Sequence, residues 1–168
     1  VSVRFGYAVD VITLGGCGPG PHSSSPKRQS NVYRLRRHRN NEWDVAWITL
    51  ELENENLAEL ELGSGNLRVT SIKWRARQGS AAICLRETTN HALILAFGGR
   101  EGPAKPLNDL SVFVYKGGRG QFFQPLAVRG EAPSPRWGHS LVRLSGTNHL
   151  AVLVGGRSAD YVCSDSLY

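Results

Sequence analysis

The chain has 168 residues, of which 40% are hydrophobic and 20% charged, with 19 glycines, 8 prolines and a formal net charge of +6. This length suits one domain, and the apolar content is high enough to form a core, which excludes a disordered chain. No apolar run approaches the roughly 18–20 residues of a membrane span, so we expect no membrane partner. Short apolar runs interrupted by glycine and proline are typical of an all-β protein.

The first expected strands lie in the N-terminal part of the chain. The run VITLGG (11–16) ends in a glycine pair and is followed, after a loop, by SNVYRL (30–35). The segment VRFGYAV (3–9) would supply the strand before it. However, the interval from Arg4 to Gly16 is much shorter than in the later copies and too short for the same two strands and turn. We therefore expect this first copy to be truncated, degenerate or wrongly assigned.

Charge is concentrated in two neighbouring segments. The basic run KRQSNVYRLRRHR (27–39) begins with Lys27 and Arg28, and the acidic run ELENENLAELEL (51–62) follows it. Clustered basic side chains can neutralise phosphates, so Lys27 and Arg28 are candidate binding residues. The alternative is a solvated strand edge whose charges block edge-to-edge pairing.

A second and a third copy follow in the rest of the chain. The runs ALILAFGG (92–99) and LAVLVGG (150–156) again end in glycine pairs. ARQGSAAICL (76–85) precedes the first of them, and PRWGHSLVRL (135–144) precedes the second. The shared glycines of the three copies are Gly15, Gly16, Gly98, Gly99, Gly155 and Gly156. Glycine permits a positive φ and a close backbone approach where the chain leaves a buried strand.

Each copy also has expected strands after its glycine pair. LNDLSVFVY (107–115) contains Asp109, and SDSLY (164–168) contains Asp165 at nearly the same interval from its glycines. YKGGRGQF (115–122) is typical of a hairpin loop, and QFFQPLAV (121–128) supplies a fourth strand. A repeated sheet of four strands indicates a β-propeller.

The pattern Pro-x-Pro-Arg-x-Gly-His-Ser, an apolar strand, Gly-Gly and then Asp resembles the kelch repeat. The match is good over 77–168 and loose over 3–35. The residues 36–72 match only as an expanded blade. Besides the glycine pairs, the repeat positions are Asp109, Arg136, Gly138, His139 and Asp165. The resemblance implies an all-β, kelch-type β-propeller fragment of about two to three four-stranded antiparallel blades.

The blades implied by this resemblance divide the chain into an irregular or expanded blade (1–75), a blade (76–132) and an incomplete blade (133–168). Propellers close with roughly four to eight blades. The chain lacks an initial Met and stops inside an expected strand, so we expect a fragment. The remaining blades of the parent chain would then be partners.

Arg100 and Arg157 each follow a glycine pair, in FGGREGPAKPLNDLSVF (97–113) and VGGRSADYVCSDSLY (154–168). These segments resemble the C-terminal propeller of wybutosine-synthesising leucine carboxyl methyltransferase-like proteins. The resemblance implies a parent tRNA methyltransferase that uses S-adenosylmethionine in a preceding domain, with tRNA as a partner and no cofactor in this chain. The alternative is a kelch adaptor that binds a protein partner, and an independent propeller enzyme is a third hypothesis.

If the copies are equivalent, Arg100 and Arg157 project from the same face and form part of a basic ring, which makes them candidate binding residues. Alternatively, each arginine caps carbonyl groups of a neighbouring blade. We expect binding by loops, because strands mainly hold the scaffold.

No catalytic site is expected in the chain. His139 is followed by a serine, but a triad requires three groups that meet in space, and a strand-start histidine is more typical of a packing role. The five histidines are dispersed and no CxxC pair exists, so we expect no metal. Cys84 and Cys163 lie in apolar segments and are expected to behave as small hydrophobic residues. Unpaired cysteines favour an intracellular location, either cytoplasmic or nuclear.

Overall fold

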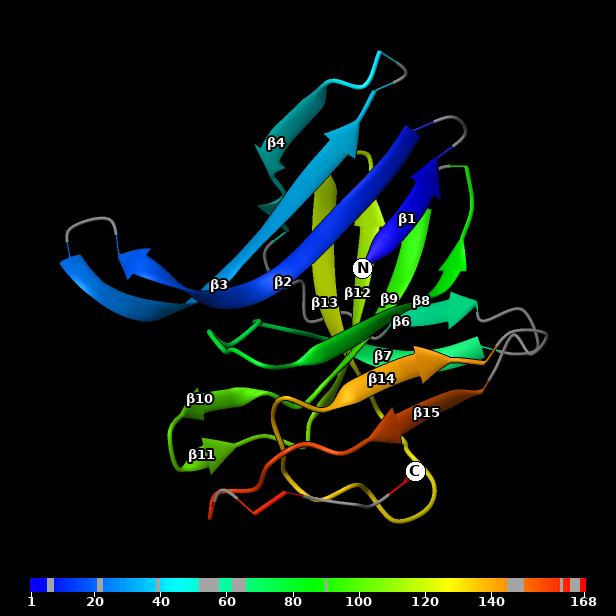
Figure 1. The fold of residues 1–168 in the computed structure, drawn as a ribbon. Coiled ribbons are helices and arrows are strands. Elements are labelled where there is room, and N and C mark those ends of the chain that lie inside the picture. Colours follow the sequence, from blue (N-terminus) through cyan, green and yellow to red (C-terminus); the bar gives the residue numbers. More distant parts are fainter. Residues whose placement is uncertain are drawn as a thin grey trace.

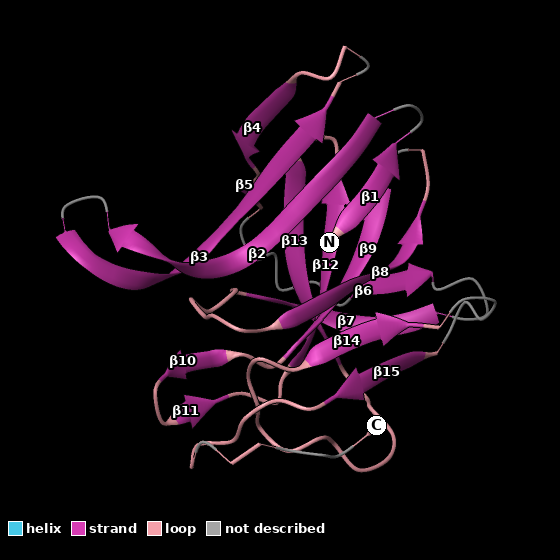
Figure 2. Cartoon of the chain, viewed as in Figure 1, coloured by secondary structure: helices cyan, strands magenta, loops and turns pink. Residues whose placement is uncertain are grey.

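The computed structural model describes residues 1–5, 8–20, 23–38, 40–51, 58–61, 66–89, 91–144, 150–160, 162–163 and 167–168. Within these ranges the protein is all-β, as predicted, and every named element is a strand (Figure 2). The strands pair in antiparallel fashion except for one two-residue parallel contact. No helix of the described part has the length and apolar character to cross a membrane.

The N-terminal strands form a four-stranded antiparallel sheet, here called the first meander. Its strands, in spatial and sequence order, are β1 (Ser2–Phe5), β2 (Ala8–Gly20), β3 (Ser23–Arg37) and β4 (Trp43–Trp47). The far ends of β2 and β3 project from the body as a long arm (Figure 1). β1 and β2 are the two strands that the interval from Arg4 to Gly16 was expected to be too short to contain, so that expectation is wrong. Both strands fit because β1 is only four residues long and Phe5 already pairs with Ala8.

Four successive strands at the centre of the molecule form the second meander, which is part of a seven-stranded sheet. Its strands, again in order, are β8 (Ala81–Glu87), β9 (His91–Phe97), β12 (Leu110–Lys116) and β13 (Arg119–Pro125). A small hairpin inserted between its second and third strands consists of β10 (Arg100–Gly102) and β11 (Lys105–Pro106). The long arm of the first meander follows the glycine pair of its own copy, as this small hairpin does.

Three strands from the segment before the second meander extend its sheet beyond β13. They are β5 (Thr49–Leu50), β6 (Ala58–Glu61) and β7 (Asn66–Ile72). β7 pairs with β13, β6 pairs with β7, and β5 makes the short parallel contact with β13. Strands from the range 1–75 thus join the sheet of the second meander and not that of the first.

The turn between β12 and β13 confirms the predicted hairpin loop. Lys116 pairs with Arg119, and the two glycines between them, Gly117 and Gly118, have φ angles of 58° and 84°. A two-residue turn with both central residues at positive φ matches the twist of the strands that it joins, which explains the glycines.

A third unit, formed by β14 (Ser140–Arg143) and β15 (Ala151–Val154), lies beside the second meander. A single bridge between Val154 and Leu167 adds the chain end to its edge. In Figure 1 this unit lies on the side of the central sheet away from the first meander.

The first and second meanders pack face to face through alternating side chains. Ile12 and Val32 of the first meander and Ile94 and Phe113 of the second belong to one buried cluster. Successive side chains of a strand point to opposite faces, so every second residue of β2 and β9 enters this core. Sheets that pack in this way bury apolar side chains from both layers.

The glycine pairs make the same contact between successive units. All six glycines have positive φ angles, from 61° at Gly98 to 127° at Gly16. The Gly16 amide donates to the Arg77 carbonyl (3.0 Å), and the Gly99 amide donates to the Arg136 carbonyl (2.9 Å). At two places in the chain, the second glycine of one copy therefore donates a hydrogen bond to the start of the next copy.

Candidate functional site

Two buried arginines, Arg77 and Arg136, make the same hydrogen bond to the first glycine of a glycine pair. Arg77 and Arg136 are each 1% exposed. Arg77 donates through Nη1 to the carbonyl of Gly98 (3.0 Å), and Arg136 donates through Nη1 to that of Gly155 (2.8 Å). Their Nε atoms also donate to the carbonyl two residues upstream, at 3.2 Å and 3.1 Å. These hydrogen bonds hold neighbouring parts of the backbone together, because the N–H groups of a buried guanidinium need acceptors within the protein.

Arg77 is neutralised by Asp109, which sequence reasoning selected as a repeat position. Its two terminal nitrogens donate to the two carboxylate oxygens at 2.7 Å and 2.8 Å. The guanidinium carbon also lies 4.0 Å from the ring centre of Trp74, a cation–π contact. Asp165, the matching candidate of the third copy, lies outside the described residues.

His139 packs between two copies. The side chain is buried, with its ring 5.4 Å from that of Phe97 in an edge-to-face arrangement. Burial lowers the pKa of His139, and the nearby charge of Arg136 lowers it further, against a smaller opposing effect of the Phe97 backbone. A buried ring in contact with Phe97 agrees with the packing role expected for His139.

The lowered pKa predicts a loss of stability in mild acid. In the unfolded chain His139 has its ordinary pKa of 6.5. In the folded chain its pKa is lower, so the ring binds a proton only at a lower pH. The unfolded state therefore binds more protons below about pH 6.5, and the free energy of unfolding falls as the pH drops toward the folded pKa. Urea unfolding at pH 8 and pH 5.5 should show this fall. His139→Phe should reduce it, because a phenylalanine ring cannot bind a proton.

Arg100 and Arg157 converge on one indole ring. The guanidinium carbon of Arg100 lies 3.7 Å from the ring centre of Trp137, and that of Arg157 lies 5.7 Å from it. The Gln78 amide is oriented with its oxygen toward Arg100. This oxygen accepts hydrogen bonds from Nη2 (2.8 Å) and Nε (3.2 Å) of Arg100. We call Gln78, Arg100, Trp137 and Arg157 the arginine–tryptophan cluster.

Backbone pairing explains why this cluster forms. Gln78 bridges Arg100, Trp137 bridges Arg157, and the Gly138 amide donates to the Gly79 carbonyl (2.8 Å), which joins the two bridges. Gln78 and Trp137 occupy the same position in successive copies. Sequence spacing predicted that the arginines share a face, but it did not predict that Trp137 lies with them.

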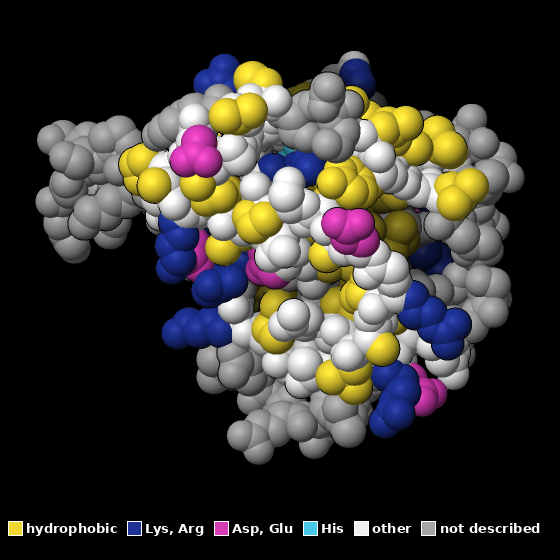
Figure 3. Space-filling view, turned by 90° about the horizontal axis from the view of Figure 1, so that it is seen from below, with side chains coloured by type: hydrophobic (Ala, Val, Ile, Leu, Met, Phe, Trp, Pro, Cys, Tyr) yellow, Lys and Arg dark blue, Asp and Glu magenta, His cyan; other side chains and the backbone are white. Residues whose placement is uncertain are grey.

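Basic and acidic side chains alternate around the cluster. Arg75 contacts Glu101 at 2.9 Å and Asp109 at 3.7 Å, and Lys105 also pairs with Glu101. The hydrogen bond from Lys105 is the main cause of a lowered Glu101 pKa, and Arg75 contributes to it. Figure 3, which views the molecule from the side of β10, β11, β14 and β15, shows dark-blue and magenta side chains next to one another.

The basic run is partly neutralised within the first meander. Arg36 donates to both carboxylate oxygens of Asp10, which is fully buried, at 2.7 Å and 2.8 Å. Arg34 pairs with Asp44 at 3.0 Å. The side chains of the candidates Lys27 and Arg28 lie outside the described residues. The described part of the run therefore contains structural ion pairs, with acidic partners on the two neighbouring strands, β2 and β4.

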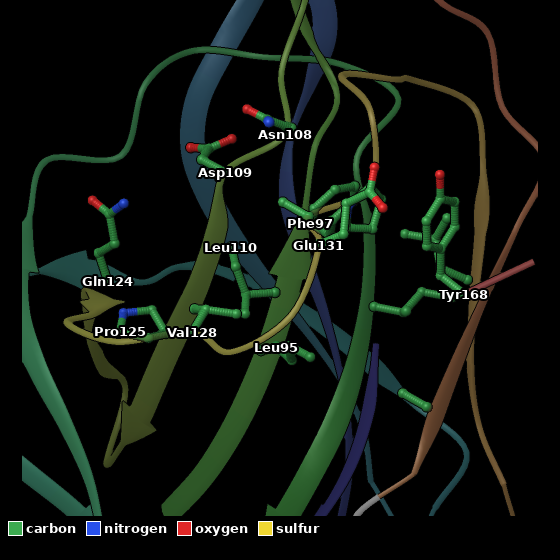
Figure 4. A pocket seen from close by; sticks show the side chains of 15 residues that line it. Leu95, Phe97, Asn108, Asp109, Leu110, Gln124, Pro125, Val128, Glu131 and Tyr168 are labelled. Carbon is green, nitrogen blue, oxygen red and sulfur yellow. The ribbon is translucent and has the colours of Figure 1, made fainter.

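An apolar cavity of about 440 Å³ separates the second meander from the third unit. Figure 4 shows Gln124 on one side of it and Tyr168 on the other, with Leu110 and Phe97 between them. Asp109 and Glu131 supply carboxylates to its lining. Apolar side chains make up most of the rest of the wall.

The cysteines differ in their surroundings. Burial is the main reason that the pKa of Cys84 is raised to about 11, which disfavours the reactive thiolate form near neutral pH. Cys163 is exposed, so the expectation that it behaves as a small hydrophobic residue is wrong. Among the described side chains, no group of three or more His, Cys, Asp and Glu is placed to hold a metal ion.

Comparison with models of known protein families finds no match to this chain, and no curated protein matches it either.

Proposed function

We propose that the chain is a segment of a kelch-type β-propeller that acts as a non-catalytic binding scaffold. The two meanders and the third unit would be successive blades. The matching Gly16–Arg77 and Gly99–Arg136 hydrogen bonds support this proposal, because repeated units should contact their neighbours in the same way. The equivalent bonds of Arg77 and Arg136 support it too.

The particular protein that we propose is a wybutosine-synthesising leucine carboxyl methyltransferase-like protein, of which this segment would be part of the C-terminal propeller. Support comes from the sequence pattern around Arg100, Arg136 and Arg157. In this proposal S-adenosylmethionine and the methyl transfer belong to another domain of the parent. The segment would contribute to holding the tRNA substrate.

The binding face would be the end of the units that carries the arginine–tryptophan cluster. The observation that carries this proposal is the convergence of Arg100 and Arg157 on Trp137. Stacking on an indole fixes the guanidinium group of Arg100, and an anionic partner would bind the donors that Gln78 does not use.

The test measures binding of phenylalanine tRNA by fluorescence anisotropy over a range of salt concentrations. Arg100→Gln with Arg157→Gln should lower the affinity and reduce the salt slope by about 1 for each arginine removed. The matched control replaces Arg68 and Arg129, which are exposed elsewhere, by glutamine. Affinity and slope that stay unchanged in the first variant would refute a role of these arginines in RNA binding.

A kelch adaptor that binds a protein partner is the second candidate. The pairing of Arg75 and Lys105 with Glu101 favours it, because it gives the face a mixed charge. Interfaces with nucleic acid are much more positively charged than those with protein. In the same experiment, this candidate predicts weak tRNA binding that the double variant does not change.

A further inference from the structure

One face of the first meander packs against the second meander, whereas its other face carries exposed apolar side chains. Trp43, Val45 and Trp47 alternate along β4 and are 55%, 68% and 63% exposed. Exposed apolar side chains that gather on one face mark an interaction surface. Strand pairing adds side chains of β2 and β3 to this surface, here called the outer face, which consists of Val11, Tyr33, Leu35, Trp43, Val45 and Trp47.

The equivalent positions of the second meander are buried. Val11 lies four residues before the first glycine of its pair, as Ile94 does. Val11 pairs with Leu35, and Leu35 pairs with Val45. The same pairing in the second meander joins Ile94, Phe113 and Phe122. All three belong to the cluster buried against the first meander, so residues at these positions are suited to contact another sheet.

The sheets that meet these positions also use equivalent residues. Leu14 directly precedes a glycine pair and is the strand partner of Val32, and both pack against the second meander. Phe97 directly precedes the next glycine pair and is the strand partner of Leu110. Both line the cavity beside the third unit. At each junction, the side chains directly before a glycine pair therefore face the following unit.

In the third unit these same positions are exposed. Val154 directly precedes the last glycine pair and is the bridge partner of Leu167, and they are 45% and 70% exposed. Val142, which is 53% exposed, pairs with Val152 and lies on the same side as Val154, because alternate residues of a strand share a face. We call Val142, Val152, Val154 and Leu167 the end face. The third unit and the first meander lie on opposite sides of the central sheet (Figure 1).

We propose that copies of this chain associate head to tail, with the end face of one copy packed on the outer face of the next. Each junction inside the chain joins one face of each kind, so a second copy reproduces a contact that the fold already makes. Such a contact uses a different surface on each partner. The two tryptophans of the outer face add side chains of the type that is enriched in interfaces. The inference rests on the proposed function only in that the units repeat, and not in what the scaffold binds.

Sedimentation velocity over a concentration series tests this association. The sedimentation coefficient of the unaltered chain should rise with concentration. Val45→Glu on the outer face and Leu167→Glu on the end face should each weaken the association at least about tenfold, because each places an unpaired charge in an apolar contact. Val128→Glu makes the same change in an exposed loop and should leave the association unchanged. All three side chains are at least 63% exposed, so the variants should fold, which circular dichroism can verify.

Mixing the two altered chains tests the head-to-tail arrangement itself. Val45→Glu retains the end face and Leu167→Glu retains the outer face, so an equimolar mixture should form a one-to-one complex that neither variant forms alone. A loss in Val45→Glu without a loss in Leu167→Glu would mean that outer faces pair with each other, which would overturn the inference. An unaltered chain that stays monomeric at every concentration, a mixture that recovers no association, or an equal loss in Val128→Glu would overturn it too. These results leave the scaffold proposal untouched, because the tRNA titration tests it separately.

Discussion

Replacing Asp109 by alanine is expected to lower the free energy of unfolding by about 3 kcal/mol, the lower end of the range for breaking a buried ion pair. The reason is the partner that remains. Arg77 is 1% exposed and would keep its charge without a carboxylate beside it. Urea unfolding followed by tryptophan fluorescence measures the change.

Two further variants show whether the ion pair causes this effect. Asp160→Ala removes an exposed carboxylate and should change the unfolding free energy by less than about 0.5 kcal/mol. Arg77→Met combined with Asp109→Leu removes both charges and should recover much of the stability, because apolar side chains of similar size often replace a buried pair without loss. A loss from Asp109→Ala no larger than that from Asp160→Ala would contradict the account.

Gly98→Ala is the second variant with a large expected effect, a loss of about 2–4 kcal/mol. Its φ of 61° disfavours any residue with a Cβ. The added Cβ would also lie 2.7 Å from the Arg136 carbonyl oxygen and 3.0 Å from Cε1 of His139, both in the next copy. A fixed backbone oxygen cannot move aside without separating the two units.

Gly117→Ala is the matched control for this prediction. Its φ of 58° is nearly the same, but no atom lies within 4 Å of where the Cβ would be. It should lose only about 1 kcal/mol, from the backbone conformation alone. The difference between the two variants therefore measures the close contact between copies. Equal losses would mean that Gly98 does not lie against the next copy.

Features that depend on local sequence could be predicted. The glycine pairs have the expected positive φ angles, and the hairpin at Gly117 and Gly118 forms where its residues indicate. The order of strands in the second meander also follows from the chain, because successive antiparallel strands joined by short turns pair with their neighbours.

Features that depend on distant pairing could not be predicted. The acidic residue that neutralises Arg36 is Asp10, far away in the sequence, so the basic run resembled an open patch. Likewise, nothing in the local pattern of β7 shows that it will pair with β13 and not with β4. Such choices depend on which buried faces become adjacent, which only the packed fold determines.

The candidate site was predictable in one part and not in another. Equal spacing after the glycine pairs placed Arg100 and Arg157 at one end of the units. The place of Trp137 beside both arginines could not be predicted, because this contact requires the hydrogen bond between Gly138 and Gly79. One signal was available: Gln78 and Trp137 occupy the same position of their copies, directly after Arg77 and Arg136.

The central claim is that successive units dock by the same glycine contact, and amide hydrogen exchange tests it most directly. In a 15N-labelled chain, the amides of Gly16 and Gly99 should exchange slowly and to a similar extent, because each donates to the arginine carbonyl of the next unit. Gly130, in an exposed loop, should exchange far faster. Exchange at Gly16 and Gly99 as fast as at Gly130 would contradict the claim.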